Sequence, residues 1–330
     1  MHLKNKFYIS ILILSSIVLS KIGIAQQLPI YTNYMLNTYA YNPAVAGSKS
    51  SAVFNLNYRN QWVGFQDAPK TYMVSIHSPV GKQKKIAIGV LVNSDNTGLL
   101  SRTSGYLTLA YHIKLNKNYK LGLGVSGGMV QYRIKLYDAK IVDSGDDLLT
   151  GNILSNNVFD SNGGLYLYSD KLFFGVATYQ YIGNKITWKD SQSNLSQHMY
   201  ATAGYTFKVS KNIAVQPSAL VKFNAPAPFQ PEFSLRVLYK NLFWIGGSYR
   251  MNDAASALIG VTIKDKLTIG YSYDMITSNI KSYASGSHEI SIAYQFIKPK
   301  KKLDADEQEL NDIDNSIKTK LKKENEKSTK

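Results

Sequence analysis

The chain has 330 residues, a formal net charge of +16, 24 tyrosines and no cysteine. Without cysteine it has no disulfide framework, so burial and strand pairing must stabilise it. The positive charge alone would suit a nucleic-acid-binding protein, but the sequence contains no helix-turn-helix, zinc-finger or RNA-recognition motif. The lysines cluster in short turns and in the last 33 positions. Solvent and lipid headgroups account for such lysines, so nucleic acid is not an expected partner.

Residues 1–25 have the pattern of a secretory signal peptide. Two lysines give a positive start, residues 7–20 are almost entirely apolar, and small residues precede a cleavage site between Ala25 and Gln26. The alternative is an uncleaved membrane anchor, but this apolar run is about 14 residues long and a spanning helix needs about 20. We therefore expect export and removal of this segment.

Residues 26–50 are polar, rich in tyrosine and asparagine, and lack period-two alternation. We interpret them as an N-terminal periplasmic segment that can plug a barrel. No later stretch of the sequence is long and apolar enough for a transmembrane helix. A membrane chain without such helices must satisfy its backbone hydrogen bonds in a closed barrel.

From Ser51 to Ile297, apolar and polar residues alternate in segments bounded by turn residues. In one segment Leu267, Ile269 and Tyr271 alternate with small or polar residues. A soluble β-sandwich would alternate too, but here tyrosines and tryptophans recur near strand ends. Short connections also alternate with longer loops, such as residues 96–101, although the loop near Asn252 and Asp253 is short. We predict an all-β fold, a transmembrane antiparallel β-barrel of about 14 strands in the outer membrane, with both chain ends in the periplasm.

Residues 298–330 change in character and predict a charged helical periplasmic tail. Leu310, Ile313, Ile317 and Leu321 form one narrow apolar stripe at helical spacing, with acids at the start of the helix and lysines at its end. The stripe suits either a solvated spacer helix or a docking helix for a periplasmic partner. The sequence leaves both readings open, because so narrow a stripe stabilises a lone helix weakly.

Residues 122–128 match two catalytic patterns, G-x-G-x-x-G of dinucleotide-binding proteins and G-x-S-x-G of hydrolases. Both patterns require a strand, a sharp turn and a helix, whereas here a strand pattern continues. Strand curvature and close approach of neighbouring groups explain the glycines better. No histidine pairs with another at metal-ligand spacing. We therefore expect no enzyme activity, no cofactor and no metal.

Charged residues lie on the expected polar face of several strands. The two signs nearly balance, which favours a salt-bridged polar core, with a ligand path or docking surface as the alternative. The set comprises Arg59, Lys222, Arg236, Arg250, Asp95, Glu232, Asp274 and Glu289.

Arg59 on the first strand points inward, within reach of Glu289 on the last strand, which closes the barrel beside it. We predict that Arg59, Gln61 and Trp62 form a structural lock at one rim rather than a ligand site, because a buried charge left unpaired is costly. Balanced inward charges and the tyrosine-rich 26–50 segment also predict a plugged or narrow lumen.

Two motifs are specific when they occur together, Asn42-Pro43-Ala44-Val45-Ala46-Gly47 and Arg59-Asn60-Gln61-Trp62. With Gly286-Ser287-His288-Glu289, they make residues 26–297 resemble the PorP/SprF family of the type IX secretion system of Bacteroidota. The resemblance implies an outer-membrane barrel that belongs to the core machinery or serves the secretion or surface retention of one large partner, often an adhesin used in gliding motility.

The resemblance implies partners but no catalytic residue. Expected partners are a secreted type IX substrate, periplasmic and outer-membrane secretion components, and outer-membrane lipid. Family members usually end near the residue equivalent to Phe296, so the 34 residues that follow set this chain apart. The strand pattern alone would also fit a FadL-like uptake channel for small solutes. An outer-membrane lipase is disfavoured because no Ser/His/acid set lies on plausible strands.

Overall fold

The computed structural model describes residues 28–135, 153–182, 185–188, 191–224 and 227–296. The chain separates into a unit of residues 1–296 and a unit of residues 297–330. The expected signal peptide and the expected helical tail, with Leu310, Ile313, Ile317 and Leu321, lie outside the described residues.

Strands make up most of the described chain. In chain order the elements are η1 (Thr38–Tyr41), η2 (Pro43–Val45), β1 (Val53–Asn60), β2 (Lys70–Val80), β3 (Ile86–Thr97), β4 (Leu100–Lys114), β5 (Lys120–Lys135), β6 (Ile153–Tyr168), β7 (Leu172–Tyr179), β8 (Lys185–Trp188), β9 (Ser191–Asn194), β10 (His198–Tyr205), β11 (Phe207–Lys208), β12 (Ile213–Asn224), β13 (Ala227–Tyr239), β14 (Phe243–Arg250), β15 (Ala254–Ile263), β16 (Leu267–Ile276), η5 (Asn279–Ser282) and β17 (Ser287–Gln295).

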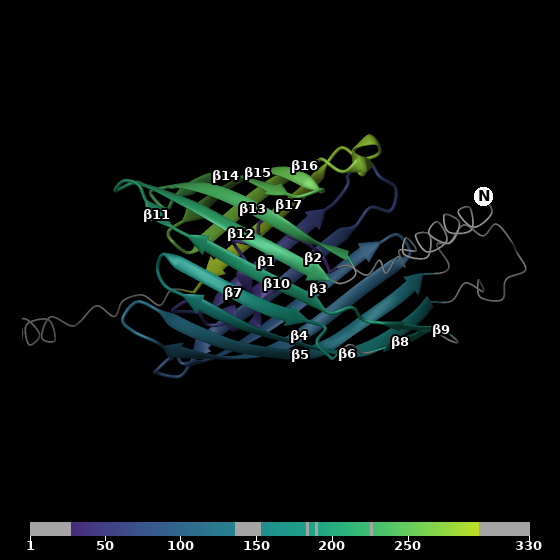
Figure 1. Ribbon diagram of the computed structural model, residues 1–330, viewed down its shortest axis with the longest axis horizontal. Helices are drawn as coiled ribbons and strands as arrows, with labels where there is room; N and C mark the ends of the chain where they lie inside the picture. The colour runs from purple at the N-terminus through teal and green to yellow at the C-terminus, as the bar shows by residue number, and fades with distance from the viewer. Residues whose placement is uncertain (1–27, 136–152, 183–184, 189–190, 225–226, 297–330) are drawn as a thin grey trace, which may run out of the picture. The chain divides into compact units, whose positions relative to one another are not determined.

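The main sheet closes on itself as an antiparallel barrel (Figure 1). Each barrel strand pairs with its neighbour in sequence, the first strand β1 pairs with the last strand β17, and β10 pairs with β12. The sheet has 15 strands by hydrogen bonding, and the two-residue β11 continues β10 along the same edge of β12. The barrel therefore has fourteen strands within the described residues, which confirms the predicted fold. The hairpin of β8 and β9 forms a separate small sheet.

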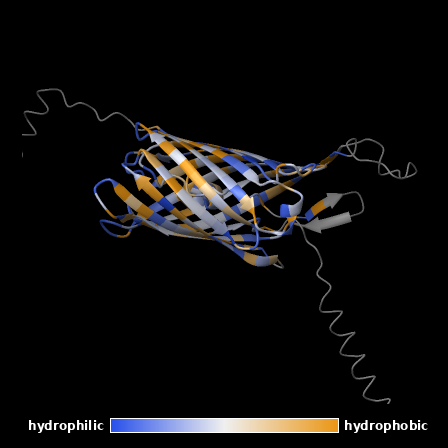
Figure 2. Cartoon of the chain, turned by 90° about the horizontal axis from the view of Figure 1, so that it is seen from above, coloured by the Kyte–Doolittle hydropathy of each residue, from blue (hydrophilic) through white to orange (hydrophobic). Residues whose placement is uncertain are grey.

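Side chains alternate between the lumen and the outer wall, as β4 illustrates. Leu107 and Leu109 are 70% and 56% exposed, whereas the alternate residues Tyr106 and Thr108 are buried. Figure 2 shows hydrophobic and hydrophilic residues alternating along the strands. An apolar outer wall around a polar interior is the pattern of a barrel that faces lipid. Among the described residues, no helix has the length and apolar character needed to cross a membrane.

The connections alternate in length less strictly than the sequence predicts. At one end of the barrel, the short-turn end, strands are joined by three to five residues. At the opposite, long-loop end, residues 61–69 and 277–286 make longer loops, but residues 98–99 make a short one. The connection at residues 251–253 is short, as the sequence indicates. The loop expected at 96–101 shrinks because β3 and β4 stay paired up to Thr97 and Leu100.

Residues 28–50, the lumen segment, run through the barrel interior from one end to the other. At the long-loop end the carbonyl oxygen of Leu28 accepts a hydrogen bond from Lys222 at 3.1 Å. At the short-turn end the carbonyl oxygen of Ser50 accepts one from Lys84 at 2.7 Å. Between them, Tyr31 to Thr32, Tyr39 and Asn42 to Gly47 are buried. Residues 28–50 therefore occupy the lumen.

The two ends of the described unit lie at opposite ends of the barrel. Leu28 lies at the long-loop end, whereas Phe296 follows β17 at the short-turn end, where its N–H donates to the carbonyl of Ala52 at 2.9 Å. The expectation that both ends lie on one side assumed that the lumen segment stays where β1 begins. Instead it crosses the lumen before β1 starts at Val53.

Two mid-strand glycines let the lumen segment pack directly on the barrel wall. A Cβ at Gly124 would overlap the backbone of Pro43 and Ala44, and a Cβ at Gly164 would overlap the side-chain amide of Asn42. That amide donates to the carbonyl oxygen of Leu165 at 2.8 Å. The glycine-rich stretch that matches catalytic patterns is therefore a contact surface for the lumen segment, consistent with close backbone approach at strand glycines.

Tyrosines supply much of the apolar packing inside the barrel. Tyr41 meets Tyr31 and Tyr200 edge-to-face, with ring centroids 6.2 and 5.2 Å apart. Tyr34 and Tyr39 are buried, and their hydroxyls form hydrogen bonds with Ser218 and Thr108. Such pairs combine a large buried ring area with a satisfied polar end.

Candidate functional site in the barrel lumen

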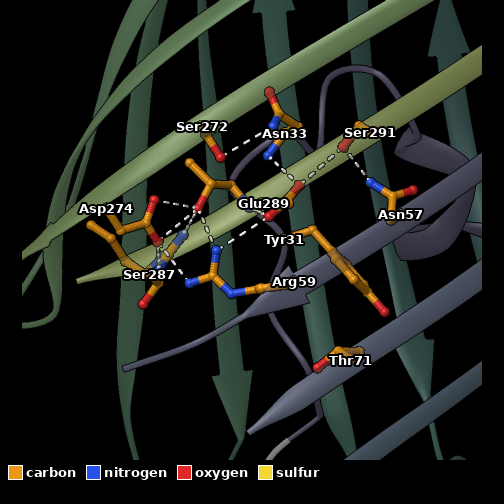
Figure 3. Close-up of polar contacts among 12 residues, drawn as sticks. Tyr31, Asn33, Asn57, Arg59, Thr71, Ser272, Asp274, Ser287, Glu289 and Ser291 are labelled. Atoms are coloured by element: carbon orange, nitrogen blue, oxygen red, sulfur yellow. Dashed lines mark hydrogen bonds and ion pairs between the residues drawn. The ribbon is translucent and has the colours of Figure 1, made fainter. Parts of the chain in front are cut away.

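Two buried arginines and the carboxylates around them form the main charged cluster of the lumen. Arg59 on β1 contacts Asp274 through Nη2 at 2.7 Å and Glu289 through Nη1 at 3.2 Å. Arg250 on β14 contacts Glu232 through Nε at 2.8 Å. Figure 3 shows Arg59 reaching from β1 toward Asp274 and Glu289. These five side chains are 0–2% exposed. We call them the lumen clamp.

Strand register explains why these residues meet. Arg59 lies directly opposite Glu289 across the β1–β17 seam, and Glu232 lies directly opposite Arg250 across β13–β14. Asp274 on β16 joins the two pairs, because its Oδ2 lies 2.7 Å from Arg59 and 3.6 Å from Arg250. The clamp thereby connects the first strand of the barrel with four of the last five.

The lumen segment supplies the centre of the clamp. The hydroxyl of Thr32 donates to Asp274 at 2.9 Å and accepts from Arg59 and Arg250, both at 3.0 Å. The backbone N–H groups of Thr32 and Asn33 donate to the two carboxylate oxygens of Glu289 at 2.7 and 3.0 Å. A buried carboxylate that accepts several charge-assisted hydrogen bonds is held strongly.

The positive and negative charges of the clamp offset one another, and backbone N–H groups stabilise the remaining negative charge. Its two guanidinium groups face three carboxylates, and Asp253 adds a fourth at 2.9 Å from Arg250. The excess negative charge lies where two backbone N–H groups point, on Glu289. Removing one member of a buried pair typically costs about 3–5 kcal/mol, because the remaining charge stays buried without its partner. The arrangement therefore holds the lumen segment in place.

The predicted site residues do not all come together. Arg59, Glu232, Arg250, Asp274 and Glu289 meet in the clamp. Arg236 lies elsewhere: its Nη2 donates to Gln216 at 2.6 Å, and its guanidinium carbon lies 4.9 Å from the ring centroid of Trp244.

Gln61 and Trp62 lie at the rim of the long-loop end, in the turn after β1. The N–H of Gln61 donates to the carbonyl oxygen of Pro69 at 2.9 Å, and the N–H of Trp62 donates to the Ser287 hydroxyl at 3.1 Å. The backbone of Trp62 has a φ of +53°. The expected lock is thus divided, with Arg59 in the clamp and the other two residues shaping the turn above it.

Sequence reasoning missed the partners that the lumen segment contributes. Thr32 and Asn33 lie within the motif Tyr31-Thr32-Asn33-Tyr34, but Asp274 and Glu289, the carboxylates that they contact, are more than 200 positions away. The only sequence signal for this contact was a Thr-Asn pair in the polar segment that precedes the barrel strands. The described residues contain no group of three His, Asp or Glu residues that could hold a metal ion.

The lumen segment leaves a cavity at each mouth of the barrel. At the long-loop end a cavity of about 510 Å³ is lined by Leu28, Gln61, Trp62 and neighbouring residues. At the short-turn end a cavity of about 960 Å³ is lined by residues 47–50 and by several strand ends.

Several solved structures are similar to this chain at low sequence identity. The chain is similar to the CymD monoaromatic hydrocarbon channel, with a TM-score of 0.49 and 12% identity over 84% of this chain and 96% of that one. It is similar to a Pseudomonas aeruginosa FadL homologue, with a TM-score of 0.44 and 12% identity over 83% of this chain and 96% of that one. It is also similar to the Acinetobacter baumannii outer membrane protein Omp33, with a TM-score of 0.42 and 8% identity over 75% of this chain and 99% of that one. A comparison with curated protein sequences finds no match.

A family model described as "Type IX secretion system membrane protein PorP/SprF" matches residues 23–294. The match includes the lumen segment and all of the barrel up to the second-last residue of β17. It confirms the resemblance drawn from the sequence motifs. Together with the closed, lipid-facing barrel, it places the protein in the outer membrane. The chain belongs to the PorP/SprF family of type IX secretion system membrane proteins.

Proposed function

We propose that this protein is a non-enzymatic outer-membrane component of the type IX secretion system that supports secretion or surface anchoring of a partner protein, such as a large adhesin used in gliding motility. The observation that carries the proposal is a barrel whose lumen is filled by its own residues 28–50. A barrel filled in this way serves better as a scaffold in the membrane than as a passage.

The clamp supports a holding role rather than catalysis. Glu289 and Asp274 are engaged by guanidinium groups, by the Thr32 hydroxyl and by backbone amides. A general acid or base needs a proton position that substrate can reach. These carboxylates are 0–1% exposed and face the protein's own segment. Their arrangement suits structural closure.

The connection lengths support one direction of the chain in the membrane. In outer-membrane barrels short turns face the periplasm and longer loops face the cell exterior. With this orientation the mouth at Leu28 faces outward, and the chain after Phe296 begins in the periplasm. The segment expected to be periplasmic would then reach the periplasm only near Ser50.

A FadL-like uptake channel for small solutes is the alternative function. Planar-bilayer conductance of the purified full-length protein separates the two. We expect no large, steady pore, because the clamp holds residues 28–50 across the lumen. A large, steady and unselective conductance would contradict the scaffold and favour the channel.

Affinity purification from the protein's own membranes tests the secretion role. We expect the full chain to retain a large secreted protein and periplasmic components. A chain that ends at Pro299 should assemble normally, since β17 ends at Gln295, but should lose the periplasmic components. If the shortened chain supports secretion and keeps every partner at native levels, residues 300–330 act only as a spacer.

A further inference from the structure

The cavity at the short-turn end is lined by an unusual number of lysines. Lys49 lies where the lumen segment leaves the barrel. Six more come from three neighbouring turns and the adjoining strand ends: Lys84, Lys85, Lys114, Lys117, Lys120 and Lys171. Among the described residues that line the cavity, Asp170 is the one acidic residue, so these residues carry a formal charge of +6, seven lysines minus one aspartate.

These positive charges have no close carboxylate partners in the described part of the chain. All five ion pairs found there belong to Arg59 or Arg250 in the lumen, and none involves a cavity lysine. Two of the lysines are positioned by neutral groups: Lys84 donates to the carbonyl oxygen of Ser50 at 2.7 Å, and the ammonium of Lys120 lies 6.0 Å from the ring centroid of Tyr168. Like charges around a concave surface concentrate the field inside it and attract anions.

The shape of the site favours a polypeptide over a lipid. The cavity lies across the mouth of the lumen, since its lining includes Gly47, His112, Gln216 and Gln295 from different sides of the barrel. A membrane lipid would meet the outer wall instead and would have to place its acyl chains against these polar groups. A single phosphate would contact only part of a cavity of about 960 Å³.

We propose that this basic cavity, defined by the seven lysines, binds an acidic, extended polypeptide segment of a partner protein. The proposal deepens the proposed function by describing a periplasmic partner site, and it rests on that function only for the compartment. The binding itself can be measured on the purified protein, so a negative result here leaves secretion untouched, and a failed secretion assay leaves this site untouched.

The test compares two triple variants of the full-length protein in detergent. The cavity variant carries Lys85→Gln, Lys117→Gln and Lys171→Gln. The matched control carries Lys208→Gln, Lys211→Gln and Lys266→Gln, which remove the same charge from the same end of the barrel but do not line the cavity. Heat-modifiable migration on gels checks that each variant has folded. The probe is a fluorescent peptide in which glutamates alternate with serines, beside the same peptide with glutamine in place of glutamate.

We expect salt-sensitive binding of the glutamate peptide, about tenfold weaker in the cavity variant and changed less than about twofold in the control. Equal loss in both variants would show general attraction to a positive rim and would overturn the proposal. So would equal binding of the glutamine peptide, or no binding of either peptide. If the cavity variant lost more binding to phosphatidylglycerol vesicles than to the peptide, the site would be assigned to lipid, and the proposal would also be overturned. Binding seen only with a chain that ends at Pro299 would mean that the chain's own later residues compete, which would contradict a site open to a partner.

Discussion

Replacing Arg59 with alanine tests the clamp at the seam where the barrel closes. The change removes the guanidinium group that lies 2.7 Å from Asp274 and 3.2 Å from Glu289, both almost fully buried. It also removes one donor to the Thr32 hydroxyl. The two carboxylates stay buried: Asp274 keeps Arg250 at 3.6 Å, and Glu289 keeps the backbone N–H groups of Thr32 and Asn33.

The expected loss of folding free energy is about 3–5 kcal/mol, the usual cost of leaving one partner of a buried ion pair alone. That is a large part of the ~5–15 kcal/mol typical of a folded domain. Arg59→Ala should therefore lower the amount of assembled barrel in the outer membrane and shift heat-modifiable migration toward the unfolded form. Urea titration in detergent should show an earlier unfolding midpoint.

Arg133→Ala is the matched control for this change. Arg133 lies on β5 with an exposed side chain, so its loss should change the folding free energy by less than about 0.5 kcal/mol. Wild-type abundance, migration and unfolding midpoint in Arg59→Ala would refute the clamp as a source of stability. Equal damage from Arg133→Ala would show that the loss of any arginine, rather than the buried pair, is responsible.

Three further changes probe the lumen segment. Thr32→Val removes a hydroxyl that bonds to three side chains, so we expect a loss of folding free energy of about 1–3 kcal/mol and faster limited proteolysis of residues 28–50. Unchanged proteolysis would argue against this role of the hydroxyl. Gly124→Ala should displace the lumen segment and reduce assembly, whereas Gly105→Ala should not, because a Cβ at Gly105 would meet open space. Equal heat-modifiable migration of the two variants would contradict this expectation. An epitope inserted directly before Leu28 should bind antibody on intact cells, and staining only after permeabilisation would reverse the proposed orientation.

The barrel itself could be predicted from the sequence because its information is local. Period-two alternation and turn residues mark each strand, and the closing pair follows from adjacency of the first and last strands. Arg59 and Glu289 were accordingly expected to meet, and the register places them directly opposite. The same reasoning overestimated the loop at 96–101, because hydrogen bonding continued β3 and β4 beyond the point where the apolar pattern ends.

The path of residues 28–50 could not be predicted from periodicity, because this segment has none. Its conformation is set by contacts to strands more than 100 positions away, such as the bond from Asn42 to Leu165. Arg236 illustrates the same limit among the charges. It shares the inward face with Arg250, but strand order places it beside Gln216 and Trp244 instead of the clamp. The register across several strands decides which inward charges form pairs, and the alternation of residues alone does not predict that register.

The clamp also makes closure of the barrel and seating of the lumen segment depend on each other. Glu289 lies on the last strand, and its oxygens accept the N–H groups of Thr32 and Asn33, residues that precede the first strand. Without the lumen segment, closure would bury Glu289 and Asp274 with too few donors, at a cost of several kcal/mol. Without closure, the two backbone N–H groups would lose their acceptor. Each event therefore stabilises the other, so the barrel and its filling should unfold together in a single transition.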